Sequence, residues 1–329
     1  MRNKLSKRIG LAASFLFKNA KTNTGPLMIG IESTNRCTLQ CKMCPRTHEM
    51  KRPIGNMDFK IFTKIIDEIK HFTEFVWLQD LGEPLLHPRI FDMIYYCRKN
   101  NLPCGISTNS TVLTPDVADK LLVSGIYYIL FAFDGATKET YEKIRVGGNY
   151  EKVVSNIKGF LEKKQKSGQE IFCAVQCIAM NETKKEIKEF KKMWSLPGVN
   201  AIRIRQLTYT GTGEFTNKRK GPCYWLWYNP HIKWDGNISP CCQDINSEFV
   251  LGNVKNNSVF ELWNSKKMES CRQLHIKGEG DKMSICKKCN MYQPHPILVA
   301  GGSLFSAYSR NRIVPRVESL ASQIRYGVK

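Results

Sequence analysis

A regular alternation of short apolar runs and amphipathic helical runs over residues 27–207 constrains the fold of this 329-residue chain more than any other feature. Parallel strands need a crossover between them, so this alternation is typical of βα units around a parallel sheet or barrel. In the run Phe59–Ile69, for example, apolar side chains recur every three or four residues and lysines occupy the opposite side. Six strands are predicted, at Met28–Thr34, Phe75–Leu81, Cys104–Asn109, Tyr128–Asp134, Ile171–Ala179 and Ala201–Leu207.

The alternation ends near Thr210–Gly213, and a module of different composition follows. Residues 222–292 hold six of the 13 cysteines and an aromatic patch, and Asp235–Gly236 predicts a hairpin turn. We therefore expect four segments along the chain. They are a basic amphipathic N-terminal segment (1–26), an α/β barrel-like domain (27–215), a small cysteine-rich domain (216–295) and a basic C-terminal tail (296–329).

The 13 cysteines are too many for chance and too unevenly spaced for a disulfide-stapled secreted module, so they indicate metal binding. No run approaches the roughly 18 to 20 consecutive apolar residues that a membrane span requires. The basic start before Ile9–Phe17 resembles a signal peptide, but the apolar run is short and no cleavage motif follows. A cytoplasmic location is therefore expected.

The formal net charge of +21 is concentrated at the ends of the chain. Residues 1–60 contain twelve Lys or Arg against three acids, and apolar stretches lie at Leu11–Phe17 and Ile313–Ile324. This combination favours an interfacial basic helix, and hence peripheral contact with an anionic membrane or an anionic lipid-linked substrate. The alternative is that the charge only gives solubility and long-range attraction. A nucleic-acid partner is disfavoured, because no separate RNA-binding module is visible.

Three cysteines, Cys37, Cys41 and Cys44, form a C-x3-C-x2-C pattern directly after the first predicted strand. In a parallel barrel this loop opens on the face where active sites lie. Zinc would require a fourth ligand close by, and His48 has no convincing spacing for that role. Three thiolates on a four-iron cube instead leave one iron free to bind a small molecule.

Here the sequence resembles the radical S-adenosylmethionine (SAM) superfamily, in which such a loop holds a [4Fe-4S] cluster whose open iron chelates SAM. The resemblance implies a partial (β/α)6 TIM-like barrel and extends to turns at the ends of successive strands. In this superfamily a Gly-Gly-Glu-Pro turn contacts the methionyl amino group of SAM. The corresponding turn here is Leu81–Pro84, in which Leu81 replaces the first glycine. The resemblance assigns SAM contacts to Gly82 and Glu83 for the amino group, Ser107 and Asn109 for the ribose, Arg145 for the carboxylate and Met43 for the adenine, and it places Asp134 in the strand-four turn of the SAM site.

The second group of cysteines comprises Cys223, Cys241, Cys286 and Cys289, the last two as C-x-x-C. Four converging thiolates suit zinc or an iron-sulfur cluster, and spacing alone does not choose. The region also resembles the SPASM/twitch extension of radical SAM enzymes, including Trp234-x-Gly236, Leu251–Asn253 and Glu261–Trp263. The resemblance implies one auxiliary [4Fe-4S] cluster, because no further cysteine follows Cys289.

The other cysteines are expected to be ordinary buried thiols. Cys242 and Cys271 are spare members of the second region, and either could replace a predicted ligand; the rest are Cys97, Cys104, Cys173 and Cys177.

The resemblance implies a dehydrogenase-type oxidoreductase. An electron would cleave SAM to a 5′-deoxyadenosyl radical, which removes hydrogen from an unactivated C–H bond, and the auxiliary cluster would take up the substrate's electron. A flavodoxin- or ferredoxin-type reductant is implied. Only 27 residues precede the first predicted strand, which favours a small metabolite, sugar-like or lipid-linked substrate over a peptide that needs a leader-binding domain. The alternatives are a radical SAM enzyme that modifies peptide or RNA and a non-catalytic iron-sulfur electron carrier.

Overall fold

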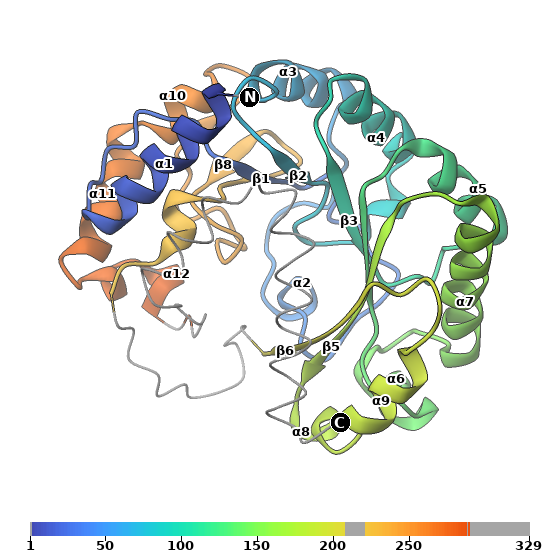
Figure 1. Cartoon of the computed structure of the whole chain (residues 1–329). Coiled ribbons are helices and arrows are strands. Elements are labelled where there is room, and N and C mark those ends of the chain that lie inside the picture. Colours follow the sequence, from blue (N-terminus) through green and yellow to red (C-terminus); the bar gives the residue numbers. More distant parts are fainter. Residues whose placement is uncertain (1, 208–220, 288, 290–329) are drawn as a thin grey trace.

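The computed structural model describes residues 2–207, 221–287 and 289, and in this part of the chain nine strands form one sheet, ordered β6-β5-β4-β3-β2-β1-β7-β8-β9 (Figure 1). The first six strands pair in parallel with their sequence neighbours. They confirm the six predicted strands and the partial (β/α)6 TIM-like barrel, and the sheet does not close because β6 and β9 are its two ends. Their bounds are β1 Met28–Ile31, β2 Phe75–Trp77, β3 Cys104–Thr108, β4 Tyr128–Ala132, β5 Phe172–Ala179 and β6 Ala201–Gln206.

Several strands end earlier than the sequence pattern predicts, although the first residue beyond β1 and β2 still bonds to a neighbouring strand: the Glu32 N–H donates to the Ile232 carbonyl and the Leu78 N–H to the Gly105 carbonyl, both at 2.8 Å. β1 stops before Glu32 and β2 stops before Leu78. Further along, the chain bonds to loops: the Glu83 N–H donates to the Arg36 carbonyl at 2.7 Å, and the Asn35 N–H donates to the Gly55 carbonyl at 3.4 Å. The residues that carry chemistry therefore lie on loops supported by a rigid sheet.

The barrel helices follow the outside of the arc of strands, as Figure 1 shows for α3, α4, α5 and α7. Thr114 caps α5 by accepting from the Val117 N–H at 3.4 Å, with Pro115 in the first turn. The helical segment after β5 begins at Asn181 and is interrupted, since α8 ends at Lys184 and α9 begins at Ile187. The bounds are α2 Pro45–His48, α3 Phe59–Ile69, η1 Pro84–Leu86, α4 Ile90–Lys99, α5 Pro115–Ser124, α6 Lys138–Ile144, α7 Tyr150–Ser167, α8 Asn181–Lys184 and α9 Ile187–Trp194.

Aromatic side chains from neighbouring strands form a small second core beside the main one. Trp77 stands edge-on to both Phe75 and Tyr128, with ring centroids 5.2 and 5.1 Å apart, and Phe172 stacks on Tyr128 at 5.0 Å. This cluster is separate from the larger core that includes the apolar sides of the helices. The strand ends that follow these aromatics in sequence carry the polar residues described below.

The cysteine-rich module continues the barrel sheet rather than forming a sheet of its own. β7 pairs in parallel with β1, placing His231 opposite Gly30, and β8 returns antiparallel to β7. The predicted hairpin turn is confirmed, with Gly236 at φ +92°, a conformation that glycine adopts readily. The sequence pattern did not predict the join to β1. The bounds are η2 Tyr224–Trp227, β7 His231–Ile232, β8 Asn237–Ser239, β9 Gly252–Asn253, α10 Val259–Trp263, α11 Lys266–Ile276, η3 Gly280–Lys282 and α12 Ser284–Lys287.

Buried charges fasten the hairpin to the ends of β1 and β2. Asp80 forms an ion pair with Lys233, and its carboxylate lies 3.0 Å from His231 Nδ1. Glu32 pairs with both terminal nitrogens of Arg52, at 2.7 and 2.9 Å, and accepts from the Trp234 N–H at 3.1 Å. Burial penalises both members of the Asp80–Lys233 pair, yet each keeps the other ionised: the pKa of Asp80 lies well below its usual range and that of Lys233 is raised.

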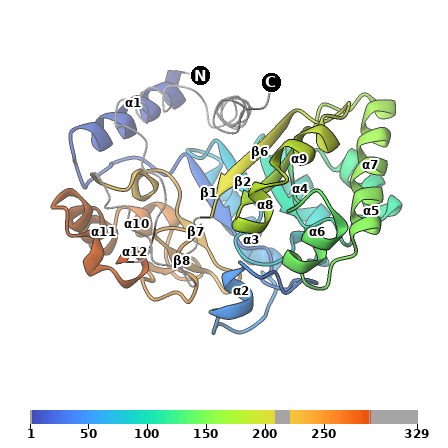
Figure 2. The same cartoon turned by 90° about the horizontal axis from the view of Figure 1, so that it is seen from below.

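The N-terminal helix α1 (Arg2–Leu16) lies beside the cysteine-rich module, opposite α5 and α7 (Figure 2). Its Leu11 and Phe15 are buried, and Phe15 stands edge-on to Trp227 with ring centroids 5.4 Å apart. Part of the expected interfacial apolar face is therefore used for packing within the protein. Searched over its described residues, the chain contains no helix with the length and apolar character needed to cross a membrane.

The expected domain boundary near residue 215 and the basic tail over 296–329 lie outside the described residues.

The Asp80–Lys233 pair leads to a stability prediction. Lys233→Met should destabilise the metal-free protein by about 3–5 kcal/mol, because it leaves a buried carboxylate short of a cation. The double variant Asp80→Asn/Lys233→Met should recover much of that loss. Urea unfolding under reducing conditions measures both. Lys163→Met, which breaks the more exposed pair with Asp119, is the matched control and should change little. A Lys233→Met loss as small as the control's would contradict the role of this pair.

Candidate functional site

The first three cysteines lie together in the loop after β1. Cys41 is buried, and Cys37 and Cys44 are half-buried. Burial raises the pKa of the Cys37 and Cys41 thiols, and the three sulfurs are close enough to influence one another. The loop's backbone is held by the end of α6 and the residues just after it, since the Gln40 and Lys42 N–H groups donate to the Val146 and Ile144 carbonyls at 2.9 Å each.

Two hydrogen-bond donors face these sulfurs, Asn109 from the loop after β3 and Arg145 from the end of α6. The Asn109 side-chain amide lies 3.4 Å from the Cys37 sulfur and 3.3 Å from the Thr38 hydroxyl. Arg145 Nη1 lies 3.8 Å from the Cys41 sulfur. Amide and guanidinium donors stabilise negative sulfur, so this thiol set suits an iron-sulfur cluster.

Gly82 and Glu83 lie directly against the start of the cysteine loop. Gly82 has φ +88°, and a Cβ there would come within 2.6 Å of the Thr34 carbonyl oxygen, so only glycine fits. Glu83 is buried and accepts from the Asn109 and Leu85 N–H groups at 2.6 and 3.1 Å. Burial raises the pKa of Glu83 to about 7 despite these bonds, which means that its charge is incompletely compensated.

Arg145 is 8% exposed, so it is not a solvated surface residue. Its Nε and Nη2 atoms donate to one oxygen of buried Asp134, at 2.8 and 2.7 Å. Burial opposes the guanidinium charge, but the Asp134 carboxylate outweighs it and raises the pKa of Arg145. The Asp134 contacts use Nε and Nη2. The Nη1 group lies on the side of Cys41, and its N–H groups are the donors available to a further anion.

Two other residues assigned to SAM lie in the same region but have less defined surroundings. Near the end of β3, the Ser107 N–H donates to the side-chain oxygen of Gln79. Met43 is half-buried between Lys42 and Cys44. The structure thus brings the strand-end residues towards the three thiols, while their contacts with SAM stay predictions.

The second group of thiols lines a cavity in the cysteine-rich module. Cys223 precedes η2, Cys241 follows β8, Cys286 lies in α12, and Cys289 lies just beyond that helix. All four line the same cavity, as do Cys242, His275 and four other residues. Over the described residues, no three His, Cys, Asp or Glu side chains of either group converge closely enough for a single metal ion.

The two spare cysteines differ in position. Cys242 lines the cavity, and burial raises its pKa to about 12, with Asp80 contributing. Cys271 lies on α11. Burial raises its pKa to about 11, and the Cys286 thiol makes the next largest contribution to this rise. Cys242 is thus the better candidate for replacing a predicted ligand. The four cysteines expected in the core are buried as predicted, namely Cys97, Cys104, Cys173 and Cys177.

Sequence reasoning missed the charged residues around the hairpin and the histidine at the second cavity. Asp80 directly precedes the Leu81–Pro84 turn, so an acid at a predicted strand end was the available signal. His275 follows Cys271 by one helical turn, which places both on one face of α11.

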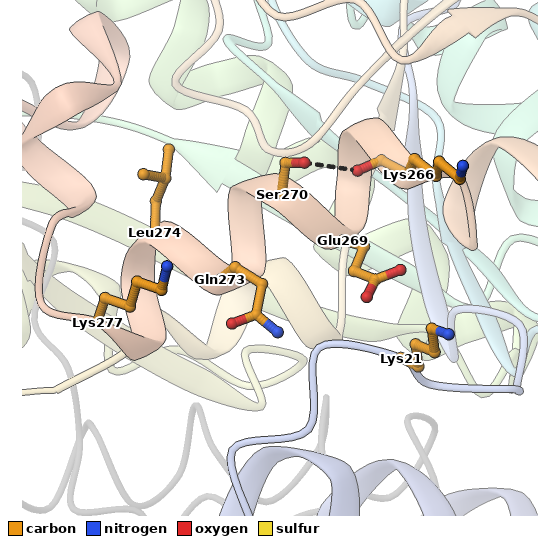
Figure 3. A pocket seen from close by; sticks show the side chains of 7 residues that line it. All are labelled: Lys21, Lys266, Glu269, Ser270, Gln273, Leu274 and Lys277. Carbon is orange, nitrogen blue, oxygen red and sulfur yellow. Dashed lines mark hydrogen bonds between the residues drawn. The ribbon is translucent and has the colours of Figure 1, made fainter.

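A larger hollow lies elsewhere, along an exposed side of α11. Figure 3 shows Lys21, Lys266 and Lys277 around it, with Glu269 and Gln273 between them. Most of these side chains are exposed, and none of the predicted ligands lines this hollow. We therefore place the chemistry at the thiol groups.

Comparisons with known proteins agree with this geometry. Residues 31–193 match the model of the radical SAM superfamily, and residues 223–290 match that of the SPASM iron-sulfur cluster-binding domain. A cofactor-modifying protein for tungsten-containing aldehyde ferredoxin oxidoreductase from Pyrococcus furiosus is 24% identical over 291 residues, 72% of this chain and 80% of that protein. The S-adenosyl-L-methionine-dependent 2-deoxy-scyllo-inosamine dehydrogenase of Niallia circulans is 22% identical over 281 residues, 80% of this chain and 92% of its own.

Among solved structures, Streptococcus suis SuiB bound to its precursor peptide SuiA superposes with a TM-score of 0.65 at 14% identity. It covers 84% of this chain and 72% of that one, which supports the fold. The chain therefore belongs to the radical SAM superfamily, whose members use a [4Fe-4S] cluster and SAM, and it carries a C-terminal SPASM iron-sulfur domain.

Proposed function

We propose that this protein is a radical SAM dehydrogenase that oxidises a small metabolite, sugar-like or lipid-linked, and passes the substrate's electron to one auxiliary [4Fe-4S] cluster. The observation that carries the proposal is the placement of two thiol groups on one continuous sheet. The loop after β1 bears Cys37, Cys41 and Cys44, and β7, paired with β1, leads into the module that bears the second group. A carrier protein needs clusters but has no need of a barrel mouth lined by buried polar residues.

The first cluster and SAM, when bound, supply a 5′-deoxyadenosyl radical that removes hydrogen from the substrate. Cys37, Cys41 and Cys44 would hold the iron, leaving one iron open for SAM. Asn109 and Arg145 would stabilise negative charge on the sulfurs through the hydrogen bonds described above. Asp134 is fully buried and Glu83 nearly so, so these two carboxylates are themselves shielded from water; radical chemistry requires the same of the bound substrate.

The residues around the thiols fit the polar groups of SAM. Glu83 is a buried carboxyl with incompletely compensated charge, which an incoming amino group would pair with. The Nη1 edge of Arg145 suits a carboxylate. Gly82 keeps this turn in contact with the cysteine loop, and Ser107 and Met43 lie on adjoining segments for the ribose and adenine.

In the second domain, Cys223, Cys241, Cys286 and Cys289 would hold the auxiliary cluster. The small-metabolite assignment is supported by the dehydrogenase relative, which acts on 2-deoxy-scyllo-inosamine. A peptide-modifying enzyme is the second candidate, because SuiB, with the same fold, binds a precursor peptide. An RNA substrate has only the positive charge in its favour.

The net charge of +21 favours an acidic electron donor, such as a flavodoxin or ferredoxin.

One observation supports the hypothesis of contact with an anionic membrane. Leu5, Ile9, Leu16 and Phe17 of the N-terminal segment stay exposed, although the buried face of α1 packs on the protein.

Iron counting after anaerobic reconstitution, followed by incubation with SAM and a reductant, tests the proposed function. We expect about eight irons per chain, because each thiol set holds a four-iron cube. Changing Cys37, Cys41 and Cys44 together to Ala should remove half of the iron and all 5′-deoxyadenosine formation. Cys286→Ala/Cys289→Ala should keep some SAM cleavage but stop product formation. Cys97→Ala, a buried thiol on α4, is the control and should keep all the iron. A full complement of iron without SAM cleavage would favour the alternative of a non-catalytic electron carrier. Zinc in the second site would exclude a role for that site as the electron acceptor.

Arg145→Met should weaken SAM binding roughly tenfold or more while the cluster spectrum is retained, because a charge-assisted hydrogen bond contributes about 1.5–3 kcal/mol. Equilibrium binding to the reconstituted protein measures this. The variant also leaves Asp134 unpaired, so Asp134→Asn/Arg145→Met is the matched control for stability. The double variant should regain stability without regaining affinity. Unchanged affinity in both would remove Arg145 from the SAM site.

Glu83 predicts a pH dependence of stability in the metal-free protein. Its folded pKa of about 7 lies above the ordinary 4.5, so its contribution to stability is complete below pH 4.5 and is lost as pH rises through 7. The loss amounts to about 3 kcal/mol, since one pKa unit corresponds to about 1.4 kcal/mol. Glu83→Gln should therefore lose less stability than the parent between pH 5 and pH 8 in urea unfolding. Equal losses would show that Glu83 titrates normally.

A further inference from the structure

His275 connects two of the predicted auxiliary ligands that lie far apart in the sequence. It projects from α11 into the second cavity. The backbone N–H of Cys223 donates to His275 Nδ1 at 3.3 Å, and His275 Nε2 lies 3.4 Å from the Cys286 sulfur. One imidazole ring thus spans the gap between the two ligand segments.

These two contacts determine which nitrogen of the ring carries the proton. A neutral imidazole has one donor nitrogen and one acceptor nitrogen. Because Nδ1 accepts from the Cys223 backbone, the proton lies on Nε2. The Nε2–H group is therefore directed at the Cys286 sulfur as a donor.

Packing holds the ring in this position. His275 is 3% exposed, and Gly280 of η3 lies against it. A Cβ at Gly280 would approach the ring's Cε1 to 2.8 Å and its Nε2 to 2.9 Å, closer than real contacts allow. The space for the ring thus depends on glycine at this position.

We propose that His275 is a positioning residue that raises the reduction potential of the auxiliary cluster by donating a hydrogen bond to the Cys286 sulfur. The inference rests on the proposed function, in which Cys286 is a cluster ligand. Reduction adds one negative charge to a cluster, so a donor to a ligand sulfur stabilises the reduced form more than the oxidised form. The bond makes the cluster a better acceptor for the substrate's electron.

The test isolates the auxiliary cluster in the full-length chain by changing Cys37, Cys41 and Cys44 to Ala. In this background, His275, His275→Phe and His275→Gln are compared by potentiometric titration followed by electron paramagnetic resonance. Glutamine can present its Nε2–H near the position of the imidazole Nε2–H, whereas phenylalanine has no donor. We expect a midpoint potential shifted to more negative values in His275→Phe, one close to the parent in His275→Gln, and equal iron in all three.

Two further variants separate the hydrogen bond from general effects on the fold. Gly280→Ala keeps the imidazole but displaces it, and should shift the potential in the same direction as His275→Phe. Gln273→Ala, an exposed change on the same helix, should leave the potential unchanged. The inference is overturned if His275→Phe and Gly280→Ala keep the parent potential, or if His275→Phe and His275→Gln both lose their iron. If the parent background binds no cluster, the assignment of Cys286 fails, and the inference fails with it.

Discussion

The placement of the cysteine-rich module depends on two buried carboxylates at the ends of barrel strands. The Glu32 side chain is fully buried and the Asp80 side chain is 2% exposed, so an unpaired charge on either would be strongly destabilising. Their partners come from elsewhere in the chain: Lys233 and His231 from the hairpin for Asp80, and Arg52 from the segment before α3 for Glu32. The barrel end is therefore satisfied electrostatically only when the hairpin and the segment that carries Arg52 are both in place. This requirement, together with the pairing of β7 with β1, sets the position of the second cavity relative to the first thiols.

The predictable parts of the fold are those that depend on local sequence patterns. The six barrel strands and the cap at Thr114 follow from hydrophobic spacing and from side chains within a few residues of each other. The pairing of β7 with β1 has no such signal, because it joins residues about 200 positions apart and involves two-residue edges. Asp80 and Lys233 are likewise ordinary charged residues in sequence, and only the fold makes them a buried pair.

The candidate site divides in the same way. The cysteine spacing and the strand-end turns predicted which residues would gather, since carboxyl ends of parallel strands meet at one edge. Their partners could not be predicted. Arg145 was expected to face an anion, and the structure shows that Asp134 already neutralises it and that Cys41 lies beyond. Gly82 was expected to contact SAM, and its positive φ shows a second reason for glycine, the close approach of the Thr34 carbonyl.

The two thiol groups have different hydrogen-bond donors, and this difference bears on how they could work together. The first group is faced by an amide and by a guanidinium whose charge is already balanced by Asp134. The second is faced by a neutral imidazole whose tautomer is set by the Cys223 backbone. Electron transfer from substrate to an auxiliary cluster requires that cluster to be the better acceptor, so the surroundings of its sulfurs matter as much as its distance. The sheet sets the relative position of the two groups through β1 and β7, and the local donors are left to set the difference in potential.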